Sequence, residues 1–341
     1  METIKVLIVD DSAVVRMQIA SLLSPHKDIQ IVGEGRNGEE AIEMAQKLSP
    51  NIITIDLHMP VMNGQEAIEE IMSTKATPIL VISDAEESDA AFKAISAGAL
   101  SLYPKGQLAD DDGKQFIQKI RLLSKVKVIK HIRRKRHIPK SLPAKIEMPP
   151  GRKRTGNKVL AIASSTGGPK ALSIILEALP EDFPCPIVIA QHIADGFVPG
   201  LAQWLNSMSK INVKVAEEGE DLKPGTAYLS VPEKNLVLAG ERVKYLTAES
   251  TDIYHPSCNK LLSSVAETYG RDSIGIILTG MGDDGVLGLK QIKSNGGKTF
   301  AQDKESSVVY GMPKVAVEKG AADKTIPIKN MAAEICRLIY R

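Results

Sequence analysis

A serine- and glycine-rich turn follows an apolar run in the second half of the chain. Residues 159–163 are apolar, and SSTGGP follows as residues 164–169. Proline favours the first turn of a helix, so Ser165 is expected at a helix N-terminus, where free N–H groups stabilise negative charge. Such a turn suits the oxyanion of an attacked ester, but it suits a bound phosphate as well. The turn matches neither GxSxG nor GxGxxG, so taken alone it leaves both chemistries open.

Two further strand ends in this half offer a base and an acid. His192 ends the segment PIVIAQH, and Asp284 lies in the segment TGMGDDG. Serine, histidine and acid from three strand ends of one sheet are geometrically compatible with a catalytic triad in the order Ser165, His192, Asp284. The ordinary alternatives are a structural histidine and helix capping by Asp283. Cys258 is a weaker candidate nucleophile, because no strand-to-helix turn surrounds it.

The first half contains a different set of polar residues at predicted strand ends. They are Asp10, Asp11, Asp56, Ser83 and Lys105. Parallel sheets bind ligands at the carboxyl ends of their strands, so these side chains are expected to converge. Three carboxylates repel one another unless a cation joins them, and Mg²⁺ suits oxygen ligands and an incoming phosphate. Asp56 is then the nucleophile toward a phosphoryl group, Asp10 and Asp11 help to hold the metal, and Ser83 and Lys105 contact phosphoryl oxygens.

The elements that position the acidic set alternate between strand and helix. Short apolar runs rich in β-branched residues predict five strands, at residues 6–9, 29–32, 52–55, 79–82 and 100–103. Helical patterns lie between and after them, at residues 14–23, 39–48, 65–72, 90–97 and 115–123. This alternation predicts an α/β domain over residues 1–124, with a five-stranded parallel, doubly wound sheet.

The second half resumes the α/β pattern after an interruption. Residues 158–341 are expected to form a doubly wound α/β domain with a small β excursion in the middle. Its strands are predicted near residues 159–163, 187–190, 227–231, 236–238, 243–246, 274–278 and 298–301, and its helices near 169–179, 260–269 and after Asp284. Between the domains, residues 125–157 are basic, contain four prolines and keep little apolar periodicity, which is typical of a linker.

Composition is that of a globular protein with an uneven charge distribution. The 341 residues are 43% hydrophobic and 25% charged, and no apolar run is long enough to span a bilayer, so no membrane insertion is expected. The three cysteines suggest neither a disulfide framework nor a zinc site, and we expect a cytoplasmic protein. Residues 125–158 hold 13 Lys and Arg residues but one acid. A solvated linker is favoured over a nucleic-acid-binding segment, since no helix-turn-helix pattern follows.

The motifs of the first domain resemble the receiver domain of bacterial two-component response regulators. The matching segments are VLIVDDS, TIDLHMPVMNG, VISD and YPKG. The resemblance implies a flavodoxin-like fold in which Asp56 accepts phosphate from a histidine kinase. It also implies that Ser83 is the switch hydroxyl and that Lys105 is the phosphate-contacting lysine.

The whole chain resembles the chemotaxis response-regulator protein-glutamate methylesterases. SSTGGP, AQHIADGF, HPSC and ILTGMGDDGVLG occur in the order of that family's motifs. The resemblance implies Ser165 as nucleophile, His192 as general base and acid, Asp284 as orienting carboxylate and the N–H of Met281 as oxyanion donor. It implies no cofactor in the esterase domain. One departure is visible, since HPSCN at residues 255–259 replaces the usual Arg-Pro-Ser-x-Asp in a segment expected on the substrate side.

These features predict a phosphorylation-activated esterase that hydrolyses γ-glutamyl methyl esters on chemoreceptors. The implied partners are methyl-accepting chemoreceptors and a chemotaxis histidine kinase. The same acyl-enzyme chemistry would also deamidate receptor glutamines. Two alternatives stay open: the same hydrolase site acting on a target outside chemotaxis, and a response regulator that binds nucleic acid through its basic linker.

Overall fold

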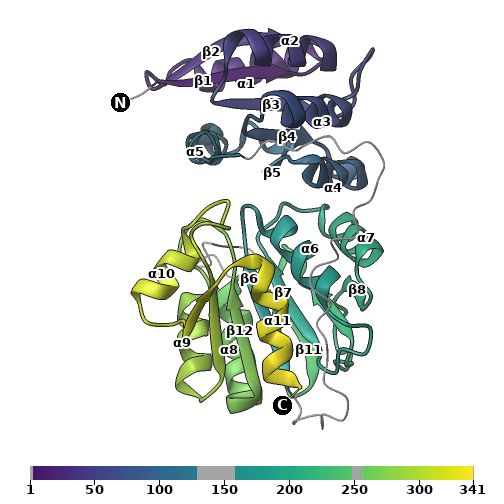
Figure 1. Ribbon diagram of the computed structural model, residues 1–341, viewed down its shortest axis with the longest axis vertical. Coiled ribbons are helices and arrows are strands. Elements are labelled where there is room, and N and C mark those ends of the chain that lie inside the picture. Colours follow the sequence, from purple (N-terminus) through teal and green to yellow (C-terminus); the bar gives the residue numbers. More distant parts are fainter. Residues whose placement is uncertain (1–2, 129–157, 248–253, 255, 341) are drawn as a thin grey trace. The chain divides into compact units, whose positions relative to one another are not determined.

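The structure, a computed structural model, describes residues 3–128, 158–247, 254 and 256–340 (Figure 1). The chain divides into two compact units between residues 138 and 139. Most of the predicted linker, residues 129–157, lies outside the described residues, as does His255. None of the helices in the described ranges has the length and apolar character needed to cross a membrane.

The first unit is a five-stranded parallel sheet with helices between its strands. The strand order is β2-β1-β3-β4-β5, and all pairs are parallel. The predicted fold class and all ten predicted elements of this domain are confirmed. The elements are β1 (Ile4–Val9), α1 (Ala13–Leu23), β2 (Ile29–Gly35), α2 (Gly38–Leu48), β3 (Ile52–Asp56), α3 (Gly64–Thr74), β4 (Ile79–Ser83), α4 (Ser88–Ala97), β5 (Ser101–Pro104) and α5 (Lys114–Leu123).

Side-chain caps determine where three of these helices begin. The side chains of Ser12, Asn37 and Asn63 accept backbone N–H groups in the first turns of α1, α2 and α3. Each cap satisfies a donor that the helix itself leaves free. The caps therefore mark where the connections after β1, β2 and β3 end and the helices begin.

The second unit is built on a seven-stranded parallel sheet in the order β14-β13-β12-β6-β7-β9-β8. Chain order reverses between β12 and β6, and such a switch point is where open α/β sheets bind ligands. Helix α6 packs beside α7 and α11, whereas α8 packs beside α9 (Figure 1). The elements are β6 (Val159–Ser164), α6 (Gly168–Ala178), β7 (Ile187–Gln191), α7 (Val198–Met208), β8 (Asn212–Val215), β9 (Thr226–Leu229), β10 (Lys234–Ala239), β11 (Arg242–Thr247), α8 (Cys258–Tyr269), β12 (Ser273–Ile277), α9 (Val286–Ser294), β13 (Lys298–Gln302), α10 (Met312–Glu318), β14 (Lys324–Ile326) and α11 (Ile328–Ile339).

The predicted β excursion is smaller than the run of β-type residues suggested. The first of these runs forms β9, which pairs in parallel with β7 and β8 inside the main sheet. Only β10 and β11 form a separate antiparallel pair. The sequence analysis did not predict β8 (NVKV) or β14 (KTI), because short strands with exposed polar residues lack a clear apolar run.

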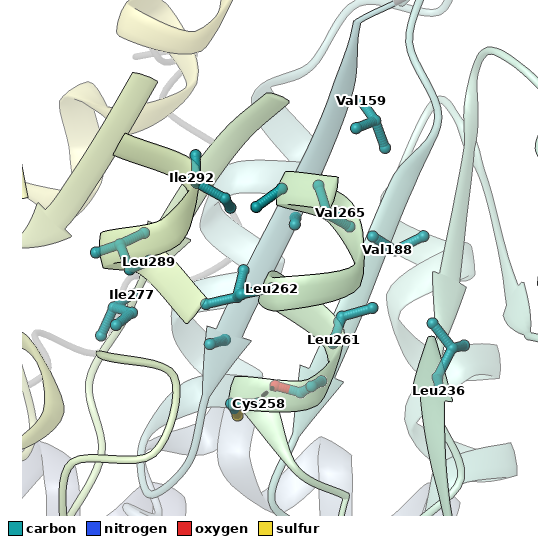
Figure 2. Packing of buried hydrophobic residues seen from close by; sticks show 14 of the residues in the cluster. Val159, Val188, Leu236, Cys258, Leu261, Leu262, Val265, Ile277, Leu289 and Ile292 are labelled. Carbon is teal, nitrogen blue, oxygen red and sulfur yellow. Dashed lines mark hydrogen bonds between the residues drawn. The ribbon is translucent and has the colours of Figure 1, made fainter. Parts of the chain in front are cut away.

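A buried apolar cluster joins α8 and α9 to the sheet (Figure 2). It includes Cys258, Leu262 and Leu289, each fully buried. Gly288 allows the close approach of the two helices, because a Cβ atom there would lie 2.6 Å from Cβ of Leu262. This packing holds the N-terminal end of α8 beside the N-terminal end of α9, where the triad acid lies.

Candidate active site

An acidic pocket lies at the carboxyl ends of β1 and β3. Asp10 follows β1 and Asp56 ends β3, and each is only 1% exposed. Nζ of Lys105 lies 3.0 Å from Oδ1 of Asp56 and 3.7 Å from Oδ2 of Asp10. One carboxylate oxygen from each of Asp10, Asp11 and Asp56 lies within 4.8 Å of the other two. The structure thus brings together the four charged residues that the sequence placed in this pocket.

The negative charge in this pocket is only partly compensated. Burial, with the neighbouring charge of Asp56, raises the pKa of Asp10 to about 6. Burial also raises the pKa of Asp56, against the hydrogen bond and charge of Lys105. Oδ2 of Asp10 is buried and accepts no hydrogen bond from the described residues. An orphaned carboxylate oxygen among three acids fits an oxygen-preferring divalent cation such as Mg²⁺.

Ser83, the predicted switch hydroxyl, makes a contact that the sequence did not reveal. Oγ of Ser83, at the end of β4, donates to Oε2 of Glu87 over 2.9 Å. Oε1 of the same carboxylate lies 2.7 Å from Nδ1 of His58. Burial is the main cause of the raised pKa of Asp56, and the charge of Glu87 adds to it. Burial lowers the pKa of Lys105, but the hydrogen bond and charge of Asp56 outweigh it, with further contributions from Asp10 and Glu87, so the Glu87 carboxylate also acts on this acidic cluster. Its side-chain direction could not be read from the spacing of residues 83 and 87.

In the second unit, the two adjacent serines have different environments. Ser164 is the last residue of β6, is 0% exposed, and its Oγ donates to Oε1 of Gln191 over 2.7 Å. Ser165 follows the strand, is partly exposed, and its backbone N–H donates to the carbonyl of Thr279 over 3.0 Å. The hydroxyl of Ser164 is therefore buried and already hydrogen-bonded within the core. Ser165 is the serine at the strand-to-helix turn, before α6.

His192 and Asp284 form the pair that the sequence predicted. Nε2 of His192 lies 2.9 Å from Oδ2 of Asp284. A carboxylate can only accept, so Nε2 carries the proton, and Nδ1 of a neutral ring is then the free base nitrogen. The ring of Tyr254 stacks parallel to the ring of His192, with 5.2 Å between centroids. Both contacts restrict the orientation of the imidazole.

The carboxylate of Asp284 is held by backbone N–H groups at the start of α8. Oδ2 accepts the N–H of Cys258 over 2.7 Å, and Oδ1 accepts those of Asn259 over 2.9 Å and Gly285 over 3.0 Å. Burial raises the pKa of Asp284, but His192 and these N–H groups together outweigh it, so the pKa lies below its usual value. Asp284 therefore stays ionised beside His192, as an orienting acid must.

The structure places Ser165 beside the base without a hydrogen bond between the two. The N–H of His192 donates to the carbonyl of Ser164 over 2.9 Å. His192, which directly follows β7, therefore lies next to the turn that carries Ser165. Within the described residues, Oγ of Ser165 makes no hydrogen bond to His192. Such catalytic hydrogen bonds are often long or poorly aligned before substrate binds.

The segment expected to hold the oxyanion runs directly past Ser165. A Cβ atom on Gly280 would lie 2.7 Å from Cβ of Ser165 and 2.3 Å from Sδ of Met312, so only glycine fits there. The next residue is Met281, whose N–H makes no hydrogen bond in the described part of the chain. The loop before it is fixed by Thr279, whose Oγ1 donates to the carbonyl of Thr166 over 2.9 Å. A free N–H beside the serine is what an oxyanion donor requires.

Cys258, the weaker candidate nucleophile, has the wrong environment for that role. Its side chain is fully buried, and its Sγ lies 3.3 Å from Nε2 of His192 and 3.6 Å from the carbonyl oxygen of Ala190. Burial, with the charge of Asp284, raises the pKa of this thiol well above its usual value. A thiol that stays protonated is a poor nucleophile.

Asn259, expected on the substrate side, instead caps a helix. Its Oδ1 accepts the N–H groups of Leu287 over 3.0 Å and Gly288 over 3.1 Å, both in the first turn of α9. Asparagine and aspartate both accept such hydrogen bonds, so the replacement preserves the cap.

Two protein-family models match the chain. The model described as CheB methylesterase matches residues 160–335, and the one described as response regulator receiver domain matches residues 6–111. The first spans more than half of the chain. It includes Ser165, His192, Met281 and Asp284.

Curated relatives and a crystal structure give the same assignment. The protein-glutamate methylesterase/protein-glutamine glutaminase 3 of Paramagnetospirillum magneticum is 43% identical over 98% of this chain and 96% of its own length. The corresponding protein 4 of Geobacter metallireducens is 40% identical over 98% and 99%. The crystal structure of the Thermotoga maritima CheB methylesterase catalytic domain is 38% identical, covers 54% of this chain and all of its own, and has a TM-score of 0.51. The chain therefore belongs to the CheB methylesterase family and carries a response regulator receiver domain ahead of the catalytic domain.

Proposed function

We propose that the protein is a protein-glutamate methylesterase whose activity is raised by phosphorylation of Asp56. The observation that carries the esterase proposal is the His192–Asp284 pair, held at the N-terminus of α8 beside the partly exposed Ser165. The names of the relatives support a protein glutamate methyl ester as the substrate. The resemblance of the motifs to the chemotaxis methylesterases implies that this ester lies on a methyl-accepting chemoreceptor. A glutamine side chain is the second substrate that those names support.

The proposed reaction begins at the serine. Oγ of Ser165 attacks the ester carbonyl carbon while its proton passes to Nδ1 of His192. The N–H of Met281 stabilises the oxyanion, a contribution of a few kcal/mol in hydrolases of this type. Asp284 stabilises the doubly protonated imidazole that forms. Nδ1–H then protonates the departing methoxide, and methanol leaves.

The acyl-enzyme is hydrolysed by the same groups in the second half-reaction. Water attacks the Ser165 ester as His192 accepts its proton, and the proton then returns to Oγ as the glutamate leaves. With a glutamine substrate the first leaving group is ammonia instead of methanol. No cofactor is required for either reaction, because each proton has a donor and an acceptor among these residues.

In the receiver domain, Asp56 is the proposed phosphate acceptor and a histidine kinase the phosphodonor. Asp10, Asp11 and Asp56 would hold Mg²⁺, which when bound neutralises charge between the carboxylates and the incoming phosphoryl group. Lys105 would then pair with a phosphoryl oxygen, and Ser83 would leave Glu87 to bind another. That movement of Ser83 is the proposed start of activation.

The test of the esterase proposal compares the two adjacent serines. Ser165→Ala should abolish methanol release from a methylated receptor fragment, because it removes the nucleophile. Ser164→Ala removes a buried hydroxyl bonded to Gln191 but keeps the nucleophile, so methanol release should be lowered and not abolished. Activity of Ser165→Ala within tenfold of the parent protein would contradict the assignment.

A further inference from the structure

The last residue of β7, Gln191, is a buried polar residue in an otherwise apolar strand. Its side chain is 3% exposed, and it pairs across the sheet with Ser164 at the end of β6. A buried amide needs partners for one acceptor and two donor positions. Gln191 finds a partner for each of these positions.

The amide connects the nucleophile turn with the residue that carries the base. Oε1 accepts the hydroxyl of Ser164 over 2.7 Å. Nε2 donates to two backbone carbonyls, that of Ser165 over 2.8 Å and that of His192 over 2.8 Å. One planar NH₂ group thus bridges the main chains of two residues that are 27 apart in sequence.

The neighbouring turn is shaped around this amide. A Cβ atom on Gly168 would lie 1.9 Å from Oε1 of Gln191, so any other residue would displace it. The φ angle of Gly168 is not positive, and so the requirement for glycine is the close approach of the amide rather than an unusual backbone conformation. The second glycine of SSTGGP and the glutamine of AQH are therefore complementary parts of one packing arrangement.

We infer that Gln191 is a positioning residue that sets the separation of Ser165 and His192. The inference rests on the proposed function, in which these residues exchange a proton. The N–H of His192 also donates to the carbonyl of Ser164, one residue before the nucleophile, and the amide adds a second link that reaches Ser165 itself. A displacement of about 1 Å between reacting groups costs about 100-fold in rate, so a bridge between their main chains is expected to matter for catalysis.

Two substitutions of similar shape separate positioning from packing. Gln191→Met keeps the volume and removes all three hydrogen bonds. Gln191→Glu keeps the acceptor toward Ser164 but places a carboxylate oxygen against two carbonyl oxygens, so the buried acid is expected to take up a proton. As the neutral acid it can restore one of the two bridging hydrogen bonds.

The measured quantities are kcat and KM for methyl-ester hydrolysis by the full-length protein. Gln191→Met should lower kcat at least tenfold while KM changes less than threefold, because substrate contacts are kept. Gln191→Glu should show a loss that shrinks as pH falls from 8 to 6, relative to the parent protein at each pH. The matched control is Thr299→Val, which removes a buried hydrogen bond to the N–H of Asp323 near the start of β13. It should lower the free energy of unfolding but keep kcat within twofold.

A kcat within twofold of the parent for Gln191→Met, or a pH-independent loss for Gln191→Glu, would overturn the positioning role. If Gln191→Met does not fold, the pH series of Gln191→Glu decides the question. Labelling of Ser165 by a fluorophosphonate is measured first in the parent protein. Failure of that labelling would contradict the proposed function itself, whereas normal labelling with unaffected variants would contradict only the role of Gln191.

Discussion

Replacing Asp284 with asparagine tests the local electrostatics of the triad. The carboxylate accepts four hydrogen bonds, from Nε2 of His192 and from the N–H groups of Cys258, Asn259 and Gly285. An asparagine amide has one acceptor oxygen, so its NH₂ group must face N–H donors in either orientation. If it faces His192, it favours the tautomer with the proton on Nδ1, which cannot accept the proton of Ser165.

The size of the effect follows from these contacts. Loss of the charge and of the correct tautomer should lower kcat by about 10³–10⁴-fold, or about 4–5.5 kcal/mol of transition-state stabilisation. Each backbone donor left unpaired in the core should cost about 1–3 kcal/mol of stability. Because the pKa of Asp284 lies below its usual value of 3.8 in the folded protein, the contacts of its carboxylate contribute stability above about pH 4, and this contribution is lost only at lower pH.

Methanol release and chemical denaturation measure the two effects separately. Asp283→Asn is the matched control, because Asp283 is adjacent but exposed, and its kcat should stay within threefold of the parent. An Asp284→Asn protein with kcat within tenfold of the parent would refute the proposed orientation of His192. Equal losses in Asp283→Asn and Asp284→Asn would refute it as well.

The remaining predictions concern a helix cap, the thiols and the acidic pocket. Asn259→Ala should lower the free energy of unfolding by about 1–2 kcal/mol, because α9 loses its cap, whereas Asn259→Asp should keep it; equal stability of all three proteins would contradict the cap. Iodoacetamide should modify none of the three buried cysteines in the native protein, since burial raises their pKa values, to about 12 for Cys185 and about 11 for Cys336; rapid native labelling seen by mass spectrometry would contradict this. Asp10 binds its proton more tightly folded, with a pKa of about 6, than unfolded, near 3.8, so stability should fall as pH rises through this window. Asp10→Asn should therefore raise the free energy of unfolding at pH 7 by about 1–3 kcal/mol in the absence of Mg²⁺, and an unchanged or lower value in denaturation would contradict it.

Residues at strand ends were predictable because the sheet geometry itself brings them together. Apolar β-branched runs locate the strands, and parallel pairing then places their carboxyl ends at one edge. Asp10, Asp56 and Lys105 follow from that argument without knowledge of any side-chain direction. The same argument puts Ser165, His192 and Asp284 at three strand ends of one domain.

The finer parts of both sites depend on side-chain directions that spacing does not determine. No sequence periodicity predicts the hydrogen bond from Ser83 to Glu87 or the bridge made by Gln191. The one available signal for Gln191 was a polar residue inside a buried strand. The cap made by Asn259 was not predictable, because its partner, the N-terminus of α9, is close only through the packing of α8 on α9. Which nitrogen of His192 faces Asp284 likewise required the structure.

Methanol release from a methylated receptor fragment, measured with and without a small-molecule phosphodonor and Mg²⁺, tests both the esterase site and its control through Asp56. The parent protein should release methanol faster with the phosphodonor, Asp56→Asn should show the same rate with and without it, and Ser165→Ala should release none. A phosphodonor effect that persists in Asp56→Asn would contradict control through Asp56. Methanol release by Ser165→Ala at the parent rate would contradict the esterase site.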